Sequence, residues 1–315
     1  MLGLTLGCEK YDLIIIGGGA AGLTAGIYGV RSKLKTLLLE KLPLMGGQIV
    51  YSEKVENYPG FPEGISGVDL TALMEAQARG LGLEIKTGGV IEVNDGGDIK
   101  RVLCDGEEYL CRAIIIATGA SPNRLGVAEE ERFIGKGISF CGTCDGFFFK
   151  DLEVIVVGGG DTAIDEALYL TRYVKKVYIV HRRNALRATK ISQERAFKND
   201  KIEFIWDTVV AKVEGDKSVE KVILKNVKTG TTWEKPISGI FVFVGIKPNA
   251  AFLHETVVLD EQGFIVTNEA LETSVPGIFA AGDVRKKILR QLSTAVGDGA
   301  TAAFAVEKYL EKFIR

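Results

Sequence analysis

A glycine turn closes the first apolar run of the chain, in the segment Tyr11-Asp-Leu-Ile-Ile-Ile-Gly-Gly-Gly-Ala-Ala-Gly22. The continuous apolar residues before Gly17 are typical of a buried parallel strand. Residues 23–31 then have helical spacing, and a second apolar strand, Thr36–Leu39, ends in Glu40, 23 residues after Gly17. A glycine turn between a strand and a helix, followed by an acid at this distance, predicts a dinucleotide-binding fold.

The same pattern occurs a second time. The apolar run Glu153–Val157 leads into Gly158-Gly-Gly-Asp-Thr-Ala163, and residues 163–173 have helical spacing. The next apolar strand, Val177–Val180, ends at His181, again 23 residues after the first glycine of its turn. Two dinucleotide-binding folds in matching register are therefore predicted.

Each half of the pattern closes with an apolar strand, a glycine and a Pro-Asn turn, at Ala113–Asn123 and Gly239–Asn249. We interpret these segments as crossings between domains. Residues 277–283 and 297–313 predict a last strand and an amphipathic helix that complete the first domain. The sequence thus predicts an α/β protein with two Rossmann-like domains, the second inserted into the first. The predicted boundaries are 1–118 and 248–315 for the first domain and 119–247 for the inserted domain.

The residue that ends the second strand of each fold indicates the ligand. Glu40 can accept hydrogen bonds from both hydroxyls of an unphosphorylated ribose, as in FAD or NAD. The second fold has His181-Arg182-Arg183 there instead, with Arg187 one turn on, and arginines bind a 2′-phosphate where a carboxylate would repel it. NADPH is therefore preferred over NADH, although a solvated basic turn is the plain alternative. We interpret Asp161 as a helix cap.

Composition excludes several classes of protein. The 39 Lys and Arg against 41 Asp and Glu leave a net charge of −2, so nucleic acid is not an expected partner. The sequence has no run of about 18 apolar residues, so we expect no membrane span. Residues 1–10 lack the pattern of a secretory signal. Five cysteines without such a signal argue against a structural disulfide framework and for a cytoplasmic location.

Two cysteines form a CxxC pair in the run Cys141-Gly-Thr-Cys144-Asp145, just before the second glycine turn. Such a pair is half of a zinc site, a redox dithiol or two unremarkable loop cysteines. Zinc needs a second pair, which Cys104 and Cys111 do not supply, so we expect no metal. A redox dithiol gives a flavin the electron acceptor it requires. Asp145 then moves a proton, or it only forms a turn ahead of the next glycine.

These motifs resemble those of the low-molecular-weight thioredoxin reductases over essentially the whole chain. Besides the glycine turns and the cysteine pair, the resemblance rests on Gly46-Gly47-Gln48, Val55-Glu-Asn57-Tyr-Pro-Gly60, Ala117-Thr-Gly119, Ala281-Gly-Asp283 and Arg290-Gln291-Leu292. The absence of cysteine from residues 41–50 separates the chain from the larger glutathione-reductase-like class. Gly142 departs from the family pattern, since relatives often have alanine or proline there.

The resemblance implies FAD and NADPH as cofactors, a homodimer, and thioredoxin or a thioredoxin-like small redox protein as the substrate. The residues implied around FAD are Gly17, Gly19, Ala20, Ala21, Gly22, Glu40, Lys41, Gly46, Gly47, Gln48, Asn57, Val90, Ala117, Thr118, Gly119, Gly282, Asp283, Arg290, Gln291 and Leu292. Those implied around NADPH are Gly158, Gly160, Asp161, Thr162, His181, Arg182, Arg183, Arg187 and Gly245.

The resemblance also implies the chemistry. Cys144 is the thiol nearest the flavin, Cys141 attacks the substrate disulfide and Asp145 is the general acid and base. Since the nicotinamide site and the dithiol lie on the same inserted domain but must meet one flavin, we expect that domain to rotate. The hinges are predicted near residues 118–122 and 245–248.

Three alternatives stay open at this point. A dithiol oxidase of the same fold would pass electrons to oxygen, and a ferredoxin-driven reductase would take them from an iron–sulfur protein. Neither needs the arginines after the second strand. A non-catalytic NADPH-binding redox sensor leaves the cysteine pair and the flavin motifs unexplained.

Overall fold

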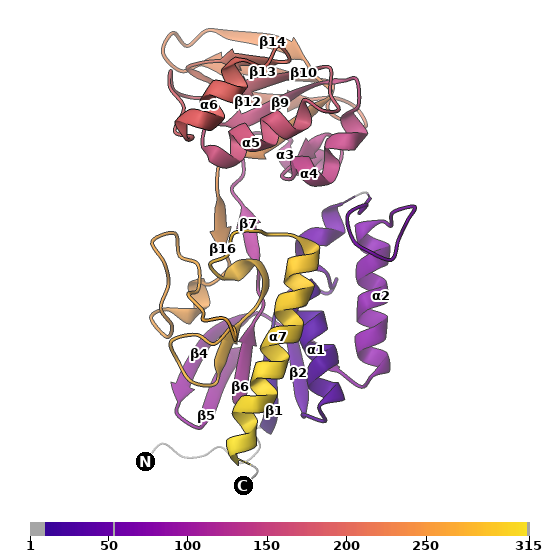
Figure 1. Ribbon diagram of the computed structural model, residues 1–315, viewed down its shortest axis with the longest axis vertical. Helices are drawn as coiled ribbons and strands as arrows, with labels where there is room; N and C mark the ends of the chain where they lie inside the picture. Colours follow the sequence, from indigo (N-terminus) through magenta and orange to yellow (C-terminus); the bar gives the residue numbers. More distant parts are fainter. Residues whose placement is uncertain (1–9, 53, 314–315) are drawn as a thin grey trace. The chain divides into compact units, whose positions relative to one another are not determined.

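The computed structural model describes residues 10–52 and 54–313, and the chain divides into two compact units. The first unit contains residues 10–50, 58–121 and 247–313, and the second contains residues 51–52, 54–57 and 122–246. The strands and helices of the second unit come from one continuous stretch of the chain (magenta to orange in Figure 1), whereas those of the first unit come from stretches before and after it. No helix in the described ranges has the length and apolar character that a membrane span requires.

A seven-stranded sheet forms the framework of the first unit (Figure 1). Its strands run in the order β3-β2-β1-β6-β5-β4, and β17 pairs with β6 as well. Its strands are β1 (Lys10–Ile16), β2 (Thr36–Glu40), β3 (Glu84–Thr87), β4 (Val90–Gly96), β5 (Ile99–Cys104), β6 (Glu107–Ile116) and β17 (Ile278–Ala280). The pairs around β1 and β2 and the pair of β6 with β17 are parallel, whereas β4, β5 and β6 form an antiparallel meander.

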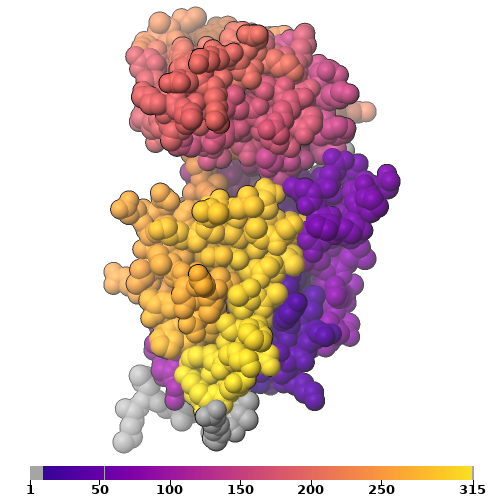
Figure 2. All heavy atoms as spheres, viewed as in Figure 1, coloured from indigo at the N-terminus to yellow at the C-terminus, as the bar shows by residue number. Residues whose placement is uncertain are grey.

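Three long helices pack in this unit. They are α1 (Ala20–Arg31), α2 (Gly67–Gly80) and α7 (Leu292–Leu310), and the short turns of 3₁₀ helix are η1 (Gly47–Tyr51), η3 (Ala251–Leu253), η4 (Gly282–Val284) and η5 (Glu311–Phe313). α7 lies against α1 because Gly299 has no side chain to meet Ala21 and Thr24. In the space-filling view α7 (yellow) lies at the surface (Figure 2). It begins five residues before its predicted start because Gln291 and Thr294 form a capping box.

The second unit combines two sheets. A parallel sheet has the order β11-β10-β9-β15-β8, and an antiparallel sheet has the order β12-β13-β14. The strands are β8 (Ile138–Ser139), β9 (Glu153–Gly158), β10 (Lys176–Val180), β11 (Ile202–Ile205), β12 (Thr208–Glu214), β13 (Lys221–Asn226), β14 (Thr232–Pro236) and β15 (Gly239–Phe243). The helices are α3 (Glu130–Phe133), α4 (Gly142–Asp145), η2 (Gly146–Phe149), α5 (Asp161–Leu170) and α6 (Lys190–Phe197).

Both faces of the parallel sheet in the second unit are buried. Along β9, Val154 and Val156 pack with apolar residues of α5 and α6, whereas Ile155 and Val157 pack with those of the antiparallel sheet. A strand covered on both faces has no polar face to show, which is why its sequence is a continuous apolar run.

The two units share one strand pattern. In each, the strand before the glycine turn lies between the next strand of the chain and a later strand, in the orders β2-β1-β6 and β10-β9-β15. The predicted fold class, α/β with two Rossmann-like domains, is confirmed. Two short strands, β7 (Ala120–Pro122) and β16 (Ile246–Pro248), pair with each other where the chain passes from one unit to the other.

Candidate active site

The first glycine turn brings bare backbone to the start of α1. Gly17 has a φ of +109°, which favours glycine. A Cβ on Gly17 would meet the backbone of Ala117, and one on Gly22 would collide with the carbonyl oxygen of Gly17. Side chains are thus excluded on both sides of the turn, and the start of α1 is suited to a pyrophosphate.

Glu40 lies beside this turn, as its place at the end of β2 predicts. Its Oε2 accepts the N–H of Gly18 at 2.5 Å, and its Oε1 accepts the N–H of Leu42 at 3.0 Å. The N–H of Gly46 donates to the carbonyl of Gly18 at 2.8 Å, so the Gly46–Gly47 loop lies against the same turn. Residues from three separated segments of the predicted FAD set are therefore together.

Asp283 has a buried carboxyl oxygen that is suited to accept a hydrogen bond from a ligand. Its carboxyl is buried, and its Oδ1 has no hydrogen-bond partner in the part of the chain that the structure describes. Burial raises the pKa of this carboxyl, against the lowering by the charges of Lys287 and Arg290. An unpaired buried acceptor is costly unless a ligand donates to it. The hydroxyl groups of FAD are such donors, so the residues present fit this cofactor.

Asp298 of α7 holds the segment that carries Asp283. Its carboxylate accepts the N–H of Gly282 at 3.0 Å, the guanidinium of Arg285 at 2.8 and 2.9 Å, and the ammonium of Lys287 at 2.8 Å. Burial raises the pKa of Asp298, but the two cations outweigh burial and the pKa is lowered. Asp298 is not among the residues predicted from the sequence, although an acid within the small and apolar residues of an amphipathic helix is a usable signal.

The second glycine turn has the same construction. Gly158 has a φ of +153°, and a Cβ there would meet the carbonyl of Phe243. The N–H of Arg187 donates to the carbonyl of Gly159 at 2.7 Å, which folds the basic loop back onto the turn. The exposed arginines of that loop are Arg182, Arg183 and Arg187. Three exposed cations beside a glycine turn suit a phosphate.

His181 differs from its arginine neighbours. Its ring is buried, with 6% of the residue exposed, and it lies directly under Gly159, where a Cβ would collide with it. Burial lowers the pKa of His181, and the nearby arginines lower it further. Its Nε2 has no partner within the described ranges. The ring therefore supports the glycine turn from below.

The capping predicted for Asp161 is wrong for its own helix. α5 begins at Asp161 after an N-cap at Gly160, and no side chain caps it. The carboxylate turns instead to Thr189, whose N–H donates to it at 2.7 Å. Thr189 is the N-cap residue of α6, so Asp161 connects the starts of two helices.

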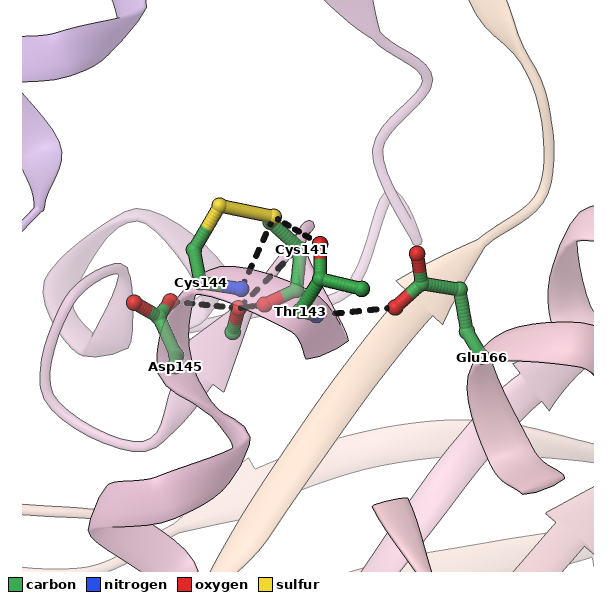
Figure 3. The surroundings of a disulfide bond; sticks show 6 residues. Cys141, Thr143, Cys144, Asp145 and Glu166 are labelled. Carbon is green, nitrogen blue, oxygen red and sulfur yellow. Dashed lines mark hydrogen bonds between the residues drawn. A yellow bond between two sulfur atoms is a disulfide. The ribbon is translucent and has the colours of Figure 1, made fainter. Parts of the chain in front are cut away.

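The cysteine pair is a disulfide at the start of α4, with an S–S distance of 2.07 Å (Figure 3). Cys141 is the N-cap residue, and its Sγ accepts the N–H of Cys144 at 3.2 Å. The hydroxyl of Ser139 donates to Asp145 Oδ2 at 2.6 Å, which orients that carboxylate beside the pair. In Figure 3, Asp145 and Glu166 lie on opposite sides of the disulfide-bearing turn.

The two other cysteines among the described residues belong to the first unit. Cys104 and Cys111 are free and buried in the first unit, and burial raises the pKa of their thiols to about 11 and about 12. Buried thiols of such high pKa are poor nucleophiles. Within residues 10–52 and 54–313 no group of three or more His, Cys, Asp or Glu side chains is placed to hold a metal ion. Cys8 lies outside the described residues.

Several other predicted residues lie in three further places. Ala117, Thr118 and Gly119 lead into β7, and Gly245 directly precedes β16. Arg290 lies over the ring of Phe264 at 4.1 Å, Gln291 is the N-cap residue of α7 and Leu292 is its first residue. Asn57 groups with the second unit, unlike the other residues predicted for FAD.

Comparison with known proteins gives the family. Residues 11–299 match the family described as pyridine nucleotide-disulphide oxidoreductase. The chain belongs to this family. It is 48% identical over 303 residues to a thioredoxin reductase of Listeria innocua, with 96% of this chain and 94% of the relative covered. It is 47% identical over 308 residues to one of Peptoclostridium litorale, with 96% and 98% covered.

Solved structures agree with these sequence relatives. A thioredoxin reductase of Streptococcus pyogenes superposes with a TM-score of 0.92 at 46% identity, covering 96% of this chain and 99% of that one. One of Lactococcus lactis, described as the FR conformation, superposes with a TM-score of 0.68 at 48% identity, covering 96% and 100%. The predicted resemblance to the low-molecular-weight thioredoxin reductases is confirmed.

Proposed function

We propose that this chain is an NADPH-dependent thioredoxin-disulfide reductase that uses FAD. The observation that carries the proposal is the Cys141–Cys144 disulfide, which the chain places in the same unit as a glycine turn with three exposed arginines. FAD, when bound, supplies a two-electron carrier between NADPH and this disulfide. The relatives named thioredoxin reductase indicate the substrate.

The cofactor residues divide between the units. FAD belongs to the turn at Gly17 with Glu40, and the unpaired Asp283 is to accept a hydrogen bond from one of its hydroxyls. NADPH belongs to the turn at Gly158, and the exposed arginines after β10 are to bind its 2′-phosphate. His181 acts indirectly, by supporting the backbone of that turn.

The side chains around the disulfide carry the exchange chemistry. Two electrons and two protons convert the disulfide to two thiols, and Asp145 is positioned at α4 to take or give a proton. The Cys141 thiolate then attacks the thioredoxin disulfide, whose S–S bond breaks as a mixed disulfide forms. The Cys144 thiolate displaces the thioredoxin sulfur, which re-forms the Cys141–Cys144 bond and releases reduced thioredoxin. The net reaction consumes one NADPH and one proton for each disulfide reduced.

Rotation of an inserted domain, residues 119–247, is part of this proposal. Gly119 and Gly245 flank the paired strands β7 and β16 and have φ values of +66° and +108°. Relatives of nearly equal identity, 46% and 48%, superpose with TM-scores of 0.92 and 0.68. Divergence in sequence does not account for that difference between the two relatives, whereas a different arrangement of their domains would.

The homodimer and the cytoplasmic location predicted from the sequence stay predictions. Light scattering of the purified protein measures the first, because a dimer has twice the 34.1 kDa of the chain.

Cys141→Ser tests the function. The variant should lose NADPH-dependent reduction of thioredoxin, whereas bleaching of the bound flavin by NADPH without oxygen should persist, because that step needs no cysteine. Cys111→Ser is the control, since this thiol is buried in the other unit, and it should retain thioredoxin turnover. Full turnover by Cys141→Ser would remove the dithiol from the mechanism. Turnover with oxygen and a small dithiol in place of thioredoxin would instead favour the oxidase.

A further inference from the structure

Glu166 of α5, which the mechanism above does not use, contacts α4, the helix that begins at the disulfide. Its Oε2 accepts the N–H of Thr143 at 3.1 Å, as Figure 3 shows. The N–H of Gly142 also faces this carboxyl and lowers its pKa. The carboxylate of Glu166, 23 positions after Thr143 in the chain, therefore binds the first backbone N–H groups of α4, directly after Cys141.

The donors at the beginning of α4 are shared between this carboxyl and a sulfur. The first N–H groups of a helix have no partner within the helix, and they stabilise a nearby anion. In α4 these groups belong to Gly142, Thr143 and Cys144. The first two face Glu166, and only the third donates to Cys141 Sγ, at 3.2 Å. A thiolate at Cys141 thus has only part of the stabilisation that a free helix start would provide.

Gly142 makes this arrangement possible. A Cβ at this position would collide with Oε2 of Glu166, so an alanine would push the carboxyl away. A proline would in addition lack the N–H. Position 142 is where the family resemblance leads us to expect alanine or proline. The glycine at position 142, which departs from the family pattern, therefore permits the close approach of Glu166.

We propose that Glu166 is a positioning residue that withholds the start of α4 from the Cys141 thiolate and keeps the dithiol strongly reducing. The proposal deepens the proposed function and rests on it. A helix start that is free for a thiolate stabilises the reduced, ionised form and makes a dithiol more oxidising. A carboxylate at the same place does the opposite, because it takes the donors and repels the negative sulfur.

The other charged and titratable groups around this site are few. Asp165 and Tyr169 neighbour Glu166 on α5, and Asp145 of α4 is held by Ser139. Burial raises the pKa of Glu166 from its ordinary value, in spite of the two N–H groups that lower it. Loss of its proton should therefore appear as a second inflection in the pH profile of Cys141 reactivity.

The test measures Cys141 directly in the FAD-loaded enzyme. Cys144→Ser leaves Cys141 as the only thiol of the pair, and its alkylation by iodoacetamide is followed by mass spectrometry over a range of pH. In this background Glu166→Gln removes the charge and keeps an acceptor. We expect alkylation about tenfold faster at neutral pH, because the thiolate fraction rises as the thiol pKa falls. The inflection assigned to Glu166 should disappear.

Two further variants make the result decisive. Asp165→Asn removes the adjacent charge of α5, whose carboxylate accepts from Ser192 and not from α4, and it should not speed alkylation. Gly142→Ala should act in the same direction as Glu166→Gln, since it displaces the carboxyl by contact. It also keeps the proposal open to refutation if Glu166→Gln fails to fold.

An unchanged or slower alkylation rate in both Glu166→Gln and Gly142→Ala overturns the proposal. The readout involves neither thioredoxin nor NADPH turnover. The alkylation result therefore keeps its meaning even if thioredoxin is not the substrate. Failure of this proposal can thus be distinguished from failure of the proposed function.

Discussion

Replacing Asp298 with asparagine should disconnect the segment that carries Asp283 from α7. The asparagine has the same shape, and its oxygen can still accept the N–H of Gly282. It has no charge for the bidentate guanidinium of Arg285 or for the ammonium of Lys287. Since only 6% of the Lys287 side chain is exposed, the variant leaves a cation largely buried without its anion.

The size of the effect follows from that burial. Removing one partner of a buried ion pair costs roughly 3–5 kcal/mol. We expect about 3 kcal/mol, the lower end, because Arg285 is 19% exposed and both long side chains can relax toward water. If this loss of stability is confined to the FAD-binding conformation of residues 282–291, the affinity for FAD falls by about a hundredfold, since 1.4 kcal/mol is tenfold.

The assay is titration of apoenzyme with FAD, followed by quenching of flavin fluorescence. Glu307→Gln is the matched control, because it also turns an acid of α7 into an amide. Among the described residues Glu307 accepts a hydroxyl hydrogen bond from Ser32, at 2.8 Å, and loss of this neutral hydrogen bond should change FAD affinity by no more than about fivefold. If Asp298→Asn binds FAD as tightly as Glu307→Gln does, Asp298 does not organise the segment.

Acid should mimic the substitution. The pKa of Asp298 is lowered in the folded chain, so its contribution is present above the ordinary aspartate range near pH ~4 and is lost as the pH falls through the folded value. FAD affinity of the wild type should therefore decrease at acid pH more steeply than that of Asp298→Asn. Parallel pH profiles would contradict this assignment.

Two further predictions concern NADPH and the hinge. The first replaces the exposed arginines after β10 with alanine, namely Arg182, Arg183 and Arg187. The KM for NADPH should rise at least tenfold while that for NADH changes little, since each charged contact to phosphate contributes roughly 1.5–3 kcal/mol. Steady-state kinetics with both nucleotides measures the two KM values, and Arg195→Ala on α6 is the control. Equal changes in the KM for NADPH and for NADH would show that these arginines do not bind the 2′-phosphate. The second is Gly245→Ala, at a φ of +108°, which should slow thioredoxin turnover and leave FAD content intact. Gly230→Ala, at +76° in the β13–β14 turn, adds similar backbone strain away from β16, and equal slowing by both would argue against the hinge.

Local sequence was sufficient for the architecture and for the redox pair. Gly17 and Gly22 could be identified because the constraint acts within one turn, where a side chain collides with adjacent backbone. Glu40 was predictable because the end of β2 is set by a parallel strand next to β1. Cys141 and Cys144 lie within one helical turn, so their spacing allows a disulfide, and the lack of a second cysteine pair together with the predicted flavin favoured that disulfide over a zinc site.

Only the tertiary structure placed the residues that support these motifs. Glu166 is 23 positions from Thr143, and Asp298 is 16 from Gly282. His181 lies under Gly159, and Asp161 turns to Thr189 of the next helix. No periodic pattern relates such partners, because each pair forms where packing brings two elements together. Glycine turns and CxxC spacing report constraints on neighbouring backbone, whereas a buried charge finds its partner only after the helices and strands have packed.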